Sequence, residues 1–121
     1  MICYIAGPYC APTERGVIEN IRAAEGVAIE LARAGIGFVC PHLNSALCVA
    51  PNGFWLEMTM QLLARCDAVV FLPTWERSAG ARAERDRALA ISMPIVDWDA
   101  SAIPALRKLA EELEEDWRME G

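Results

Sequence analysis

The sequence contains no apolar run that approaches the roughly 20 residues of a transmembrane helix. Its first residues, Met1-Ile2-Cys3-Tyr4-Ile5, lack a basic region and are typical of a strand, so we expect no signal peptide. The basic residues form no stripe of the kind that binds nucleic acid. These absences predict a cytoplasmic protein that binds neither a membrane nor nucleic acid.

The five cysteines form no CxxC pair and no zinc-binding spacing, and their number is odd. A disulfide framework and a zinc site are therefore not indicated, and we expect no metal and no cofactor. Cys3, Cys40 and Cys66 lie in or beside apolar runs, which is typical of reduced thiols in a core. Cys10, in an expected loop, is the cysteine best placed to react.

Several motifs of α/β enzymes are also missing. There is no GxGxxG and no GxxxxGK[ST], so neither a dinucleotide nor a Walker-type triphosphate site is indicated. The GxSxG elbow of α/β-hydrolases is absent. A phospho-accepting receiver domain would need acids after the first strand, where this chain has Gly7-Pro8.

The composition is that of one globular domain, with 55% hydrophobic and 23% charged residues among 121. We expect a single domain over residues 1–121, without repeats or linkers. The net charge is −6, but six of the seventeen acids lie near the C-terminus. The rest of the chain is nearly neutral, which leaves room for a small anionic ligand.

Apolar runs alternate with segments of helical spacing along the whole chain. The expected strands span residues 2–6, 36–40, 68–72 and 95–96. Four helices are expected. The first begins between Thr13 and Ile18 and ends at a Gly35 cap, and the second begins at Asn52 and includes Leu63. The third spans 78–92, and the last begins after a Ser101 cap. The segment 42–51 is expected to be irregular.

The βαβαβαβα pattern predicts an α/β fold with three layers and helices on both faces of the sheet. We expect four parallel strands, or five, in the flavodoxin-like order 2-1-3-4. A ligand site then belongs at the carboxyl ends of strands 1 and 3, where the strand order reverses.

Two helices have distinctive surfaces. The helix after Asn52 is apolar nearly all round, which favours a homo-oligomer in which this helix meets another subunit. The last helix has an acidic, solvated face and an apolar stripe, which comprises Leu106, Leu109, Leu113 and Trp117.

The stretch Ser78-Ala79-Gly80-Ala81-Arg82-Ala83-Glu84 opens the third helix directly after a buried strand and a short loop. Its small residues allow a ligand to approach the backbone, and N–H groups at a helix start attract an anion. Glu84 would lie one turn in. The alternative is plain capping chemistry, with Ser78 as an N-cap and Glu84 as a surface residue.

Three segments together resemble the nucleoside 2-deoxyribosyltransferase-like superfamily, above all its small bacterial and phage members. They are Tyr4-Ile5-Ala6-Gly7-Pro8, Cys66-Asp67-Ala68-Val69-Val70 and Trp75-xx-Ser78-x-Gly80-Ala81-xx-Glu84. The resemblance covers roughly residues 2–97.

The resemblance implies an N-glycosidic bond hydrolase or a glycosyl transferase that acts on a nucleoside or nucleoside 5′-monophosphate. Glu84 would attack the anomeric carbon and form a glycosyl-enzyme, with Tyr4 beside it. Ser78 and the loop that begins at Gly7-Pro8 would hold a 5′-phosphate.

Further side chains are candidates for substrate binding. Tyr9 and Trp75 are placed to stack on a base, with a hydrophobic lid as the alternative for both. His42, the only histidine, would touch or protonate the base, or serve the structure alone. Arg82 stands where the family has a glycine and would either narrow the pocket or bind an anion.

One departure from the family leaves the activity open. The better-known members have an acidic residue where this chain has Thr59, which cannot supply a proton near pH 7. A non-catalytic nucleotide-binding or sensing module on the same fold is therefore the alternative function. Asp67, before the third strand, is expected to be structural. The alternative to a site role for Tyr4 is that of a core side chain in the first strand.

Overall fold

The computed structural model describes residues 1–44 and 52–120, and it places four parallel strands at the centre of the chain. Their order is β2-β1-β3-β4, which confirms the expected α/β fold and its flavodoxin-like sheet. The strands are β1 (Ile2–Ala6), β2 (Gly37–Val39), β3 (Ala68–Phe71) and β4 (Ile95–Asp97).

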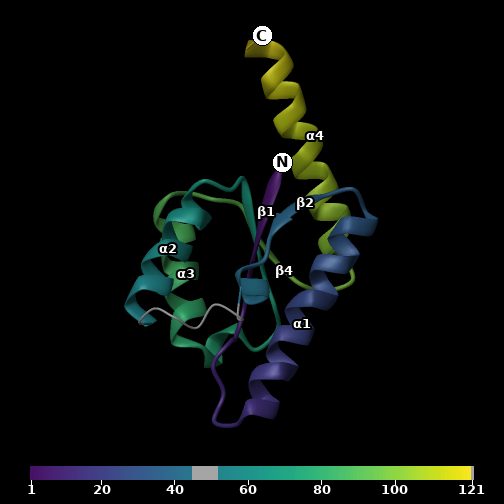
Figure 1. Cartoon of the computed structure of the whole chain (residues 1–121). Helices are drawn as coiled ribbons and strands as arrows, with labels where there is room; N and C mark the ends of the chain where they lie inside the picture. Colours follow the sequence, from purple (N-terminus) through teal and green to yellow (C-terminus); the bar gives the residue numbers. More distant parts are fainter. Residues whose placement is uncertain (45–51, 121) are drawn as a thin grey trace.

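Four α-helices cover both faces of this sheet (Figure 1). Helices α1 (Glu14–Arg33) and α4 (Ala102–Glu120) lie on one face, and α2 (Asn52–Ala64) and α3 (Ala79–Ala90) lie on the other. Two short 3-10 helices, η1 (Pro41–Asn44) and η2 (Trp75–Arg77), follow β2 and β3. The far end of α4 extends beyond the rest of the chain.

Local chemistry sets the helix ends. The Thr13 hydroxyl oxygen accepts the Gly16 N–H at 3.0 Å and begins α1, and Gly35 ends this segment with a φ of +75°. The Ser78 hydroxyl oxygen accepts the Ala81 N–H at 3.2 Å at the start of α3, as expected for an N-cap.

Several boundaries differ from the expected ones. Strand β2 is shorter than 36–40, because the Ile36 N–H donates to Leu31 at the end of α1 and Cys40 leads into η1. The 3-10 helix η1 occupies part of the segment that was expected to be irregular. Helix α3 ends at Ala90, and Ser92 beyond it has a left-handed φ of 56°.

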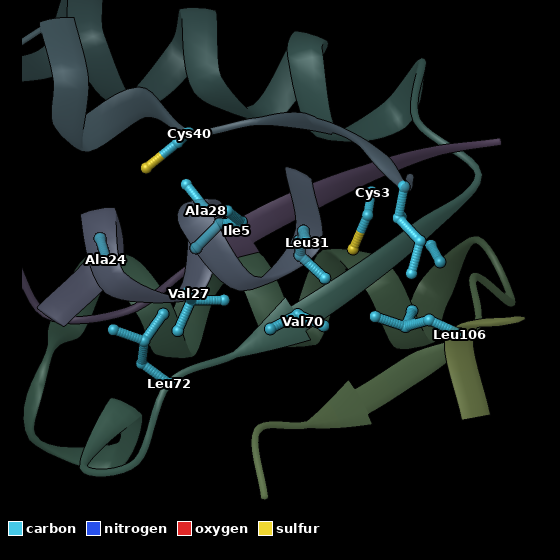
Figure 2. Close-up of a cluster of buried hydrophobic side chains, with 12 residues drawn as sticks. Cys3, Ile5, Ala24, Val27, Ala28, Leu31, Cys40, Val70, Leu72 and Leu106 are labelled. Atoms are coloured by element: carbon cyan, nitrogen blue, oxygen red, sulfur yellow. The ribbon is translucent and has the colours of Figure 1, made fainter. Parts of the chain in front are cut away.

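The larger core lies between the sheet and the α1 and α4 layer (Figure 2). Alternate residues of β1 and β3 point into it, because neighbouring side chains of a strand face opposite sides. The core includes Cys3, Ile5, Val27, Leu31, Val70, Leu72 and Leu106.

The smaller core lies on the opposite face, under α2 and α3. The other residues of the same strands, Tyr4 and Ala6 in β1 and Val69 and Phe71 in β3, pack there with Leu63 and Ala88. Tyr4 is therefore a mid-strand residue that points toward α2 and α3, paired in register with Val39 and Val69.

The C-terminal helix follows the expected stripe where it is described. Leu106 is buried, and Leu109 and Leu113 are half-buried. The side chain of Trp117 lies outside the described residues. Within the described ranges, no helix has both the length and the apolar composition to cross a membrane.

Gly7 should resist substitution because it follows β1 in close contact with Leu72. A Cβ atom at this position would lie 2.9 Å from the Leu72 Cβ atom. We expect Gly7→Ala to lower the free energy of unfolding by about 1–3 kcal/mol, measured by denaturant titration. Gly26→Ala is the matched control, since a Cβ there meets nothing within 4 Å. In the middle of α1 it should add roughly 0.5–1 kcal/mol. Equal effects of the two changes would contradict the steric role of Gly7.

Candidate functional site

Glu84 lies in the second turn of α3, and its side chain points into the protein. The residue is only 8% exposed, and its carboxylate hydrogen-bonds to the Tyr4 hydroxyl from β1. Ala81 and Ala88, one turn to either side, are buried on the same face of α3. A surface glutamate would not show this burial, so the plain capping interpretation does not describe Glu84.

Burial controls the electrostatics of this pair. Removal of water raises the pKa of Glu84 from 4.5 to about 7, and the Tyr4 hydrogen bond opposes part of that rise. Burial also raises the pKa of Tyr4, and the adjacent Glu84 carboxylate raises it further. Tyr4 therefore stays a neutral hydrogen-bond donor while Glu84 titrates near neutral pH.

Thr59 of α2 completes this group. Its hydroxyl donates to the Leu56 carbonyl oxygen at 3.0 Å and lies beside the Tyr4 hydroxyl. The sequence identified Thr59 as a missing acid but did not predict its contact with Tyr4. A signal was available: Thr59 precedes buried Leu63 by one helical turn, so both share the face that packs on Tyr4.

The start of α3 presents small and polar residues. Ser78 serves as the cap, and a Cβ on Gly80 would meet only the Ser78 hydroxyl oxygen at 3.9 Å, so space remains above this turn. The Arg82 guanidinium donates to the Glu76 carbonyl oxygen at 2.6 Å and braces η2. Arg82 remains exposed, so its charge is available at the helix start.

The loop after β1 forms a second group. The His42 Nε2 atom lies 2.9 Å from the Pro8 carbonyl oxygen, and its ring meets Tyr9 edge-on at 5.9 Å between centroids. Burial lowers the pKa of His42, so the ring is neutral near pH 7 and its Nε2–H donates to Pro8. The Nδ1 atom is buried without a partner among the described residues. This geometry favours the structural alternative for His42, which joins η1 to the loop that begins at Gly7.

Trp75 lies in an aromatic and charged cluster that the sequence did not reveal. The Arg85 guanidinium lies 4.2 Å from the Trp75 ring centroid and 4.9 Å from that of Phe71. It also forms an ion pair with Asp97 at 2.8 Å. The sequence alone does not reveal this cluster, because Phe71 and Asp97 are neighbours only through the register of β3 and β4. Arg85 thereby fixes η2, which leads into the start of α3.

Arg85→Lys is expected to lower the free energy of unfolding by about 1 kcal/mol. Lysine keeps the charge but loses the planar stacking on the rings and the two-pronged contact with Asp97. Thermal or denaturant unfolding measures the change. Arg87→Lys, at an exposed position of the same helix, is the matched control and should stay within about 0.5 kcal/mol of the parent. An equal loss in both variants would mean that the contacts of Arg85 with the rings and with Asp97 do not stabilise the fold.

Other polar candidates have structural roles. The Asp67 carboxylate accepts the Ile2 N–H at 2.7 Å and so joins the start of β1 to the turn before β3, as expected. Cys3 and Cys40 are buried, and burial raises the pKa of both thiols. Across the described part of the chain, no cluster of His, Cys, Asp or Glu is arranged to hold a metal ion.

Residues 1–97 match a family described as a domain of unknown function, DUF4406. The chain belongs to the DUF4406 family. The DUF4406 match runs from the start of β1 to the end of β4, so it contains the whole sheet with Tyr4, Thr59 and Glu84. Helix α4 lies beyond it. No curated protein shows significant similarity to the chain.

Proposed function

We propose that this DUF4406 protein is an N-glycosidic bond hydrolase or glycosyl transferase that acts on a nucleoside or nucleoside 5′-monophosphate through Glu84. The observation that supports this most strongly is the buried Glu84 carboxylate on Tyr4, with a pKa raised to about 7. Carboxyl groups whose pKa is raised by burial in this way cluster at functional sites. The resemblance to the nucleoside 2-deoxyribosyltransferase-like superfamily supports the same chemistry.

In the proposed first step, a Glu84 carboxylate oxygen bonds to C1′ of the sugar while the C1′–N bond breaks. The electron pair of that bond leaves with the base. Tyr4 donates to the carboxylate and fixes its orientation. Water or a second base then attacks C1′ and releases Glu84.

The phosphate of a nucleotide would bind at the start of α3. The first N–H groups of a helix have no partner within it, and they attract an anion. Space above Gly80 and the exposed charge of Arg82 favour this position. The loop Gly7–Tyr9, held by His42, would close the other side of the ligand.

The test is incubation of the wild-type protein with a panel of nucleosides and their 5′-monophosphates, with neutral and with cationic bases. Chromatography measures free base, and a second base is added to detect transfer. Release above the uncatalysed rate from at least one member is expected. Release from none would reject the proposed enzyme.

A nucleotide-binding or sensing module without turnover is the second candidate. The contact of Thr59, which cannot ionise near pH 7, with Tyr4 favours it. A ligand that raises the melting temperature without base release would support this module over the enzyme.

We also propose a homo-oligomer, which the exposed apolar side chains of Phe54 and Leu56 on α2 support. A cytoplasmic location stays a prediction.

A further inference from the structure

The polar groups gathered at Glu84 are hydroxyls. Tyr4 donates to the carboxylate, and the Thr59 hydroxyl lies beside Tyr4. A general acid works best when its pKa lies near the working pH, and neither hydroxyl meets that condition. Residues 45–51, outside the described structure, include no aspartate, glutamate or histidine in their sequence. In the part of the chain that the structure describes, Glu84 is therefore a nucleophile whose neighbouring hydroxyls do not protonate a departing base.

The burial of Glu84 adds an electrostatic condition. Its ionised carboxylate lies in a position that is only 8% exposed, where an uncompensated charge is costly. When a carboxylate attacks a neutral nucleoside, the negative charge moves to the departing base and stays in the site. When it attacks a cationic nucleoside, the two charges cancel as the bonds exchange. A poorly hydrated site favours the second case.

Building on the proposed function, we infer that the substrate is an N-glycoside whose base carries a positive charge, such as a pyridinium or N7-alkylated purine nucleoside or its 5′-phosphate. The C1′–N electron pair goes to the cationic ring nitrogen, and the base leaves neutral without taking a proton. The same step forms the C1′–O ester of Glu84. Water then adds to C1′, the ester bond breaks, the carboxylate is restored, and one proton goes to solvent.

If the inference holds, the enzyme distinguishes two substrates of nearly the same shape by the charge of the base. In the poorly hydrated site a cationic substrate gains from charge cancellation with the Glu84 carboxylate, which bulk water does not reward to the same extent. We therefore expect the catalysed rate, divided by the uncatalysed rate, to be at least about tenfold higher for cationic substrates. Division by the uncatalysed rate removes the intrinsic lability of the cationic bond.

Two matched pairs of probes test this. Nicotinamide mononucleotide is compared with its uncharged 1,4-dihydro form, and 7-methylguanosine 5′-monophosphate with guanosine 5′-monophosphate. Free base is measured by chromatography with the wild-type protein, beside enzyme-free controls at the same pH. A higher rate enhancement for the cationic member of at least one pair is the expected result.

Other outcomes separate this inference from the proposed function. Equal enhancement within both pairs, or a preference for the neutral members, would overturn the inference and leave the glycosidase intact. Release from none of these probes but from another neutral nucleoside would do the same. Release from no substrate of either charge would overturn both.

Thr59→Asp gives a second test, because it places a carboxyl group beside the Tyr4 hydroxyl. The preference for the cationic member should fall at least about tenfold, since the neutral member gains an acid. For the neutral member, the pH profile should acquire an alkaline limb where the new acid ionises. An unchanged preference in a folded variant would count against the inference. The wild-type comparison stands without this variant if it fails to fold.

Discussion

Glu84→Gln should abolish base release while the protein keeps its fold and its ligand affinity. The amide has nearly the shape of the carboxylate but cannot form the glycosyl ester. The groups proposed to hold a nucleotide, at Ser78 and in the loop from Gly7, are unchanged. We expect turnover to fall by about three orders of magnitude or more, measured as free base over time. Binding, measured by calorimetry or by a melting shift, should persist.

The matched control is Glu57→Gln, the same chemical change at an exposed position of α2. It should leave turnover unchanged. A nucleoside with a 2-fluoro sugar provides a direct test of the covalent step, because the substituent slows the second step and traps the intermediate. Mass spectrometry should then find the sugar on the peptide that contains Glu84. Robust release by Glu84→Gln, or an adduct on another residue, would contradict the mechanism.

The sheet was predictable because its strands are continuous apolar runs. Such runs indicate parallel strands buried on both faces, and the rule for crossover connections then leaves few orders. The start of α3 was predictable for a similar reason, since Ser78 before a run of small residues is a local capping signal. Signals of this kind need no knowledge of how distant segments pack.

The inward position of Glu84 could have been taken from its spacing. Ala81, Glu84 and Ala88 recur at intervals of three and four residues and form the buried face of α3. The face is weak as a sequence pattern, because two of its residues are small and the third is charged. The contacts of Thr59 with Tyr4 and of Arg85 with Phe71 depend on how α2 and α3 pack on the sheet. The spacing of Thr59 to Leu63 marks a shared helix face but does not identify Tyr4 as the partner, and the Arg85 contact has no local signature in the sequence.

Replacement of Glu84 should also stabilise the protein, and by an amount that depends on pH. Burial raises the pKa of Glu84 from 4.5 to about 7 in the folded state, so ionisation costs the folded state more than the unfolded state. A group with a raised folded pKa gives its full stability below its unfolded pKa and loses it as the pH rises through its folded pKa. For Glu84 that window runs from about 4.5 to about 7.

Glutamine does not ionise, so Glu84→Gln should escape this loss. At pH 4 the variant and the parent should be equally stable to within about 1 kcal/mol, because both side chains are neutral. The difference should grow between pH 4.5 and 7 and level off above it, with the variant more stable by about 3 kcal/mol. Urea titrations at several pH values measure this. Glu57→Gln, exposed on α2, should show no comparable pH dependence. A variant that is less stable than the parent at pH 8 would mean that the folded protein stabilises the Glu84 carboxylate, which would contradict the raised pKa on which its proposed reactivity rests.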